Sequence, residues 1–140
     1  MLAGLFFPTS PAALILAAIA LVDVLGATLR DVEATSVDSA VVIRGRYRWV
    51  LLTILNIAQV VLAFAVLIRY CGSHFRPVVS DFLTAVYASA VTFMTLGYGD
   101  ILPCAPTGRV VILAELCFFL FMLALKLPAA VSVMRVEVKK

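Results

Sequence analysis

The sequence predicts an all-α membrane protein with three transmembrane helices and a fourth helix of half that length. Of its 140 residues, 64% are hydrophobic and only 14% are charged, whereas roughly a quarter of residues are charged in soluble domains. A soluble domain of this length cannot bury so much apolar surface, because small domains keep a large share of their residues at the water boundary. The composition therefore disfavours a soluble enzyme, a disordered tail and a secreted disulfide scaffold.

Three apolar stretches are long enough to cross a bilayer, which takes about 20 helical residues. They are Ala12–Leu29, Trp49–Ile68 and Val110–Leu125, and the last continues to Met134. A fourth stretch, Phe82–Met94, is too short to cross, and it predicts a buried or re-entrant helix. The first stretch has an alternative interpretation as a cleavable signal peptide, which the lack of a preceding basic region disfavours.

The basic residues predict the orientation of the chain. Four basic residues lie between the first two spans and four lie toward the C-terminal end, whereas three lie between the second and third spans. In this order the groups are Arg30, Arg44, Arg46 and Arg48; Lys126, Arg135, Lys139 and Lys140; and Arg69, Arg76 and Arg109. The positive-inside rule then places the first connector and the C-terminus in the cytoplasm and the N-terminus outside. We expect an integral protein of the plasma (inner) membrane, in contact with lipids.

The charge balance and the cysteines point to few other partners. A net charge of +3 is too small and too scattered to predict nucleic-acid binding. Cys71, Cys104 and Cys117 lack zinc-site spacing, and His74 has no neighbouring ligand residues, so we expect no metal cofactor. Cys71 and Cys104 both face outside in this orientation, so a disulfide between them is possible but not required.

The segment after the half-length helix carries the distinctive chemistry. Ser80 is a plausible N-cap of that helix, and Asp81 suits its positive end. The helix is followed by the sequence Thr-Leu-Gly-Tyr-Gly-Asp at residues 95–100. Backbone without helix or sheet is tolerated at membrane depth only when it is buried in protein or lines an aqueous path. Glycine accepts positive φ, so alternating glycines allow successive carbonyls to point the same way and to replace the hydration shell of a cation.

This segment resembles the filter signature TVGYGD of potassium channels, with Leu96 in place of valine. The resemblance extends from about Trp49 to Met134, and small prokaryotic members of the family are the most similar. Together with the apolar stretches and the basic residues, it predicts an N-terminal helix with a cytoplasmic connector, a pore domain and a cytoplasmic tail, at residues 1–48, 49–134 and 135–140. Within the pore domain it implies an outer helix, a pore helix, a filter and an inner helix, at residues 49–70, 81–94, 95–100 and 107–134.

The resemblance also implies the roles of individual residues. Potassium ions would bind the backbone carbonyls of four filter residues, which are Thr95, Leu96, Gly97 and Tyr98, and Gly99 would turn the chain outward. Asp100, Tyr87 and Thr92 would support the filter from behind. The protein would then be a homotetrameric, passive, potassium-selective channel and not an enzyme, with K⁺ as the permeant ion and no cofactor.

The sequence departs from the family pattern at several positions. Met94 stands where a second threonine is common, and Val91 stands where some members carry an acid. No glycine follows Gly108, so the inner helix lacks the usual hinge, while Pro128 is a candidate kink or helix end. Two alternatives stay open: a poorly selective cation channel, and a non-conducting regulatory or interaction subunit of the membrane.

Five polar positions within the spans need an interpretation of their own. Asp23, near the predicted cytoplasmic end of the first span, is either an interfacial or paired acid or a functional one. Asn56 and Gln59 share one helix face and favour interhelical hydrogen bonds. Glu115 either charges the outer vestibule or ties the inner helix to the pore helix, and the resemblance favours the tie. Lys126 is more consistent with an interfacial anchor than with a charge that lines the pore.

Overall fold

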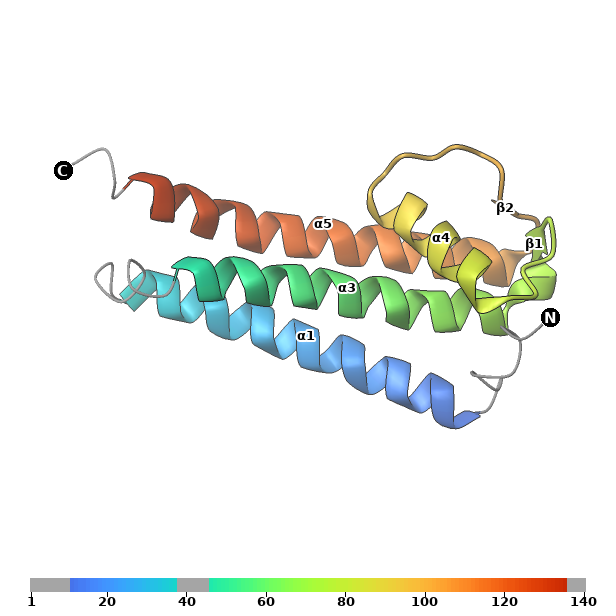
Figure 1. Cartoon of the computed structure of the whole chain (residues 1–140), viewed down its shortest axis with the longest axis horizontal. Helices are drawn as coiled ribbons and strands as arrows, with labels where there is room; N and C mark the ends of the chain where they lie inside the picture. Colours follow the sequence, from blue (N-terminus) through green and yellow to red (C-terminus); the bar gives the residue numbers. More distant parts are fainter. Residues whose placement is uncertain (1–10, 38–45, 136–140) are drawn as a thin grey trace.

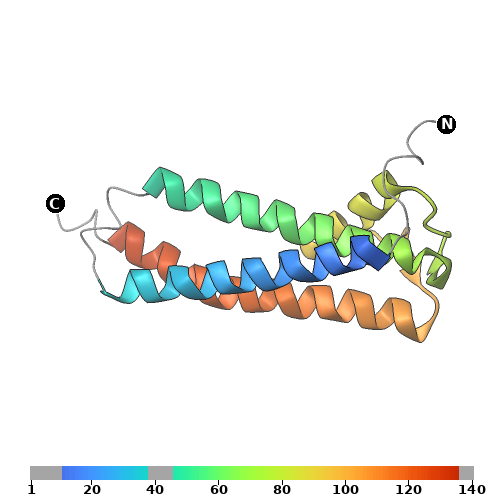
Figure 2. The same cartoon turned by 90° about the horizontal axis from the view of Figure 1, so that it is seen from below.

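The computed structural model describes residues 11–37 and 46–135, and three long helices run side by side with a short helix packed at one end (Figure 1). The long helices are α1 (Pro11–Val37), α3 (Arg46–Tyr70) and α5 (Pro106–Arg135). The short helix, α4 (Phe82–Phe93), packs mainly on α3. Figure 2 shows the three long helices again, seen from below.

The predicted arrangement of three long apolar helices and one half-length helix is confirmed. Segments Pro11–Arg30, Val50–Tyr70 and Pro106–Pro128 are long and apolar enough to cross a membrane. Helix α4 has 12 residues, so it extends only about 18 Å at 1.5 Å per residue. It cannot cross a hydrocarbon core of about 30 Å.

Two helix ends differ from the prediction. Helix α1 continues past Leu29 to Val37, and α3 begins at Arg46. The backbone hydrogen bonds of a helix do not depend on apolar side chains, so a helix can continue beyond its apolar stretch. Helix α5 passes through Pro128 and reaches Arg135, so this proline does not end the helix. The connector between these two helices, residues 38–45, and all but the first residue of the predicted cytoplasmic tail, residues 136–140, lie outside the described residues.

The outer faces of the helices are apolar and exposed. Leu16 is 66% exposed, Val22 70%, Leu83 76% and Val110 64%. Exposed apolar surface of this extent indicates contact with lipid or with other protein chains. Helix α3 has the largest buried share of the three long helices, because it lies between α1 and α4 and also contacts α5.

One buried cluster joins all four helices. Its members are Val24, Val60, Phe64, Phe93 and Met122. The ring of Phe64 lies 6.2 Å from that of Phe118, and the ring of Phe93 lies 5.2 Å from that of Phe119. Both pairs have the edge-to-face geometry that aromatic rings prefer. The cluster therefore fixes α5 against α3 and against the end of α4.

A hydrogen bond between α3 and α1 supports this packing. The side-chain amide of Gln59 donates to the backbone carbonyl of Ala20 at 3.3 Å, as expected for an amide inside a membrane helix. Asn56, one turn earlier, is half-buried. The interhelical role predicted for this face is thus present at Gln59.

The chain that leaves α3 forms a strap at residues 71–80, which contains the short helix η2 (Gly72–His74) and strand β1 (Phe75–Arg76). Val79 N–H donates to the carbonyl of Gly72 at 3.2 Å. Strand β1 pairs antiparallel with β2 (Leu102–Pro103), and Cys104 N–H donates to the carbonyl of His74 at 2.9 Å. The strap therefore anchors the segment that returns from α4 toward α5.

All three cysteines carry free thiols. The disulfide considered between Cys71 and Cys104 is therefore not formed in this structure. Burial raises the pKa of the Cys71 thiol, so the reactive thiolate is disfavoured there.

Replacement of Gly72 by alanine is expected to destabilise the strap. The added Cβ would lie 2.0 Å from the carbonyl oxygen of Val79, and relief of such overpacking costs about 1–3 kcal/mol. Thermal unfolding in detergent micelles should show a lower midpoint for Gly72→Ala. The matched control is Gly26→Ala in α1, where the Cβ meets nothing within 4 Å and alanine favours the helix by up to about 1 kcal/mol. Equal midpoints for the two variants would show that the strap is not tightly packed.

Candidate functional site

Helix α4 is fixed at its start by Asp81. The Asp81 carboxylate accepts a hydrogen bond from Thr84 N–H at 2.7 Å, which is the geometry of an N-cap. This bond lowers the pKa of Asp81, because it favours the charged carboxylate. The cap predicted at Ser80 is wrong by one residue: the Ser80 carbonyl instead accepts from the Arg69 guanidinium at 2.6 Å.

The C-terminal end of α4 is closed by backbone hydrogen bonds. They join Met94 N–H to Ala90 O at 2.9 Å, Thr95 N–H to Thr92 O at 2.9 Å and Leu96 N–H to Val91 O at 3.0 Å. The last two form the crossed pair of a Schellman motif, in which the residue after the helix is left-handed and usually glycine. Here that residue is Thr95, with a φ of 54°. A β-branched residue in this region is a strained outlier, and such strain often marks a functional site.

Positive φ recurs at every second residue of the segment Thr95–Asp100, here called the glycine loop. The values are 54° at Thr95, 58° at Gly97 and 76° at Gly99. An added Cβ at either glycine would meet nothing within 4 Å. Backbone conformation, and not lack of space, therefore requires glycine at these two positions.

The glycine loop is uncovered in the single chain. Every residue from Met94 to Asp100 is exposed, including the large side chains of Leu96 at 56% and Tyr98 at 66%. Hydrogen bonds hold both ends of the loop, at Thr95 by the end of α4 and near Cys104 by the strap. The loop is therefore held in place without being buried. Its exposed surface is therefore available to an ion or to another chain.

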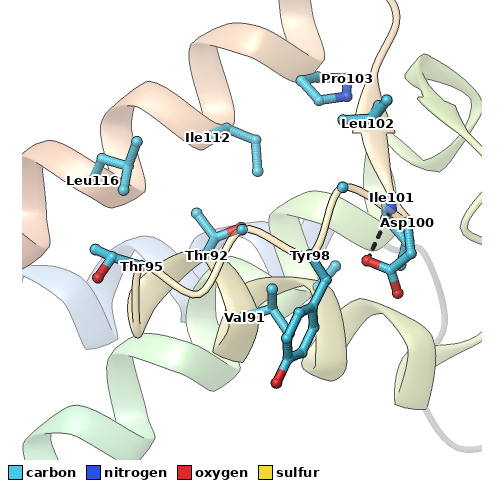
Figure 3. A pocket seen from close by; sticks show the side chains of 13 residues that line it. Val91, Thr92, Thr95, Tyr98, Asp100, Ile101, Leu102, Pro103, Ile112 and Leu116 are labelled. Atoms are coloured by element: carbon cyan, nitrogen blue, oxygen red, sulfur yellow. Dashed lines mark hydrogen bonds between the residues drawn. The ribbon is translucent and has the colours of Figure 1, made fainter.

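A cavity of about 350 Å³ lies between the glycine loop and α5. Val91 and Thr92 of α4 border it on one side, and Ile112 and Leu116 of α5 border it on the other, as Figure 3 shows. Thr92, predicted to support the loop, lines this cavity, and its carbonyl bonds Thr95 N–H. The loop thus stands away from α5 and rests on the end of α4.

Asp100 and Tyr87 meet at the far end of the loop. The Asp100 carboxylate accepts from Ile101 N–H at 3.1 Å (Figure 3). A hydrogen bond to Asp100 raises the pKa of the Tyr87 hydroxyl, since it favours the protonated phenol. The structure therefore brings together the two residues of α4 and the loop that the resemblance pairs.

Glu115 lies behind α4 and is fully buried. Its carboxyl oxygen Oε1 contacts the hydroxyl of Ser89, which also bonds the carbonyl of Val61 at 2.9 Å. Of the two interpretations of Glu115, the tie to the half-length helix is the one observed. Ser89 is not among the residues predicted from the sequence, although a serine between two alanines of an apolar helix is a signal for such a bond.

The structure places Asp23 and Lys126 in different surroundings. Asp23 is exposed and lies about 18 Å along α1 from Pro11 and about 11 Å from Arg30, so it is nearer to the Arg30 end of the apolar segment Pro11–Arg30, which is the end that the sequence predicts. Lys126 is only 9% exposed. It lies one turn after Met122, which belongs to the same buried cluster as Val24 of α1.

Comparison with known proteins gives two matches. A protein-family model described as "Ion channel" matches residues 45–135, well over half of the chain. A hyperpolarization-activated voltage-gated potassium channel of Methanocaldococcus jannaschii is 28% identical over 82 residues, which are 59% of this chain and 39% of that relative. The chain thus aligns with well under half of the relative's length. No solved structure matches.

Replacement of Asp81 by a residue that cannot titrate is expected to reduce the loss of thermal stability at acid pH. The capped carboxylate stabilises the folded chain above the usual aspartate pKa of 3.8, and this contribution is lost as the pH falls from there through the lowered pKa. Asp81→Asn keeps a capping side chain but cannot titrate, so its thermal midpoint should fall less than the native one between neutral and acid pH. Asp81→Ala should be less stable at neutral pH by about 1 kcal/mol. Parallel acid profiles for the native chain and Asp81→Asn would contradict this assignment.

Proposed function

The chain belongs to the ion-channel family whose model it matches, and we propose that it is the pore-forming subunit of a passive, potassium-selective channel. The observation that carries the proposal is the alternation of positive φ along the glycine loop, directly after a helix too short to cross the membrane. The name of the archaeal relative supports potassium as the ion.

The alternating backbone supports ion coordination by carbonyl oxygens. Positive φ at every second residue turns successive peptide groups over, so that their oxygens line one side of the strand. Carbonyls arranged in this way replace the hydration shell of K⁺. We assign this role to the backbone oxygens of Thr95, Leu96, Gly97 and Tyr98, with Gly99 turning the chain outward. The negative end of the α4 dipole, which faces the start of the loop, also favours a cation.

Four copies of the chain complete the pore. One glycine loop supplies a single strip of carbonyls, whereas an ion needs oxygens on all sides. The exposure of Leu96 and Tyr98 fits a loop that becomes covered by neighbouring copies. Tyr87 and Asp100 then brace the loop from outside the ring, through the hydrogen bond between them.

The assembly is proposed to sit in the plasma (inner) membrane with the glycine loop facing outside. The basic connector after α1 and the basic C-terminal end favour the cytoplasm. Voltage gating by α1 is not part of the proposal, because α1 carries Asp23 and no arginine before Arg30, and voltage sensors are rich in arginine.

Gly97→Ala is expected to abolish potassium flux. Alanine at a positive φ costs about 1–2 kcal/mol in each chain, and four copies meet at one ring. The measurement is ⁸⁶Rb⁺ or K⁺ uptake into liposomes that contain the purified chain. Gly26→Ala is the matched control, since it adds the same methyl group to a helical glycine with open space around it, and its flux should equal the native flux.

Three outcomes would contradict the proposal. Undiminished flux in Gly97→Ala would mean that ions pass elsewhere. Equal Na⁺ and K⁺ flux in the native chain would establish a poorly selective cation channel. A native chain that conducts nothing and stays monomeric or dimeric in mild detergent would be a non-conducting membrane subunit.

A further inference from the structure

A buried polar cluster joins three helices behind the glycine loop. It consists of the carboxyl of Glu115 on α5, the hydroxyl of Ser89 on α4 and the backbone carbonyl of Val61 on α3. The side chains of Glu115 and Ser89 are both fully buried. The proposed conduction path does not use either of them.

The number of hydrogens that this cluster needs for its hydrogen bonds indicates the protonation state of Glu115. Ser89 contacts two acceptors, yet a serine hydroxyl has one hydrogen to donate. The Val61 carbonyl can never donate, whereas a protonated carboxyl can, so both contacts are hydrogen bonds at once only if Ser89 gives its hydrogen to Val61, at 2.9 Å. The contact between Ser89 and Glu115 then needs a second hydrogen, which only a protonated carboxyl can supply.

The second carboxyl oxygen of Glu115 points to the same conclusion. Its Oε2 is buried and has no hydrogen-bond partner among the described residues. A carboxylate would therefore hold an unpaired negative oxygen in an apolar interior, which is far more costly than an unpaired neutral carbonyl.

Within residues 11–37 and 46–135, the ionisable side chains on the packed helices are engaged elsewhere or lie far from Glu115 along the axis. On α3, Arg69 donates to the Ser80 carbonyl, and on α4, Tyr87 bonds Asp100. On α5, Arg109 lies about 9 Å and Lys126 about 17 Å along the axis, while Cys117 is exposed. On α1, Asp23 is exposed.

We propose that Glu115 is a neutral carboxylic acid that positions the half-length helix through a directed chain of hydrogen bonds. The carboxyl of Glu115 donates to Ser89, and Ser89 donates to the Val61 carbonyl. The consequence for conduction rests on the proposed function, whereas the protonation state does not.

The position of this chain explains how it acts on the glycine loop. Ser89 follows Ala88, which lines the cavity under the loop, and Glu115 precedes Leu116, which lines the same cavity from α5. The hydrogen bonds therefore fix the spacing of α4 and α5 beside the cavity. Since the loop starts at the end of α4, this spacing sets where the loop lies. Removal of the Glu115 proton would leave Ser89 with one hydrogen for two acceptors and would loosen the spacing.

Infrared spectroscopy of the full chain in liposomes tests the protonation state directly. The difference spectrum between the native chain and Glu115→Gln at neutral pH should contain the C=O band of a protonated carboxylic acid. Carboxylate bands in its place would overturn the proposal. Ser89→Ala provides a second test, which does not depend on how well Glu115→Gln folds. This variant removes the hydroxyl that accepts from the Glu115 carboxyl, so the acid band should shift. An unshifted band would overturn the hydrogen-bond chain.

Potassium flux tests the positioning role. Glu115→Gln keeps a donor for Ser89 and should conduct within about twofold of the native chain, whereas Glu115→Leu and Ser89→Ala should each lose roughly tenfold, as expected when a buried partner is removed. Flux through the native chain should fall at alkaline pH, and flux through Glu115→Gln should not. Loss of flux in Glu115→Gln as large as in Glu115→Leu would mean that the negative charge is required, and it would refute a neutral Glu115. A native chain without flux, but with the acid band present, would refute the proposed function alone.

Discussion

Peptide groups that leave a helix inside a membrane need partners, because hydrocarbon offers none. The chain meets this constraint at both ends of the glycine loop. The Schellman motif after α4 uses the carbonyls of Val91 and Thr92, and the strap carbonyl of His74 receives the chain near Cys104. The peptide groups between these two anchors remain exposed in the single chain. A ring of copies around a column of dehydrated cations would provide partners for these peptide groups.

The remaining architecture serves to hold this loop. The pair of Phe93 and Phe119 fixes the end of α4 against α5, and the capping Asp81 fixes the start of α4. The contact between Glu115 and Ser89 fixes the spacing between α5 and α4. Helix α1 adds a third long helix on the other side of α3, joined there by Gln59. Because α5 is continuous through Pro128 and has no glycine after Gly108, motion of α5 would have to use a position other than a glycine hinge.

The sequence predicted the helices well because membrane helices are marked by apolar length. It misplaced the end of α1, since hydropathy reports where the apolar zone stops and not where backbone hydrogen bonding stops. It chose Ser80 in place of Asp81 as the cap, because both residue types cap helices and only the turn geometry decides between them. It located the glycine loop from its glycines but missed the positive φ of Thr95, which arises from the hydrogen bonds of the helix end. It missed Ser89 because the contact with Glu115 is set by tertiary packing between residues far apart in the chain.

In the proposed channel, four glycine loops form one column of cation sites. The most direct measurement is a structure of the assembled protein in a membrane mimetic with thallium or rubidium, located by anomalous scattering. We expect a fourfold axis with ion peaks between the backbone oxygens of Thr95 and Tyr98. Loops that lie apart from a common axis, or ion peaks only outside the loops, would contradict it.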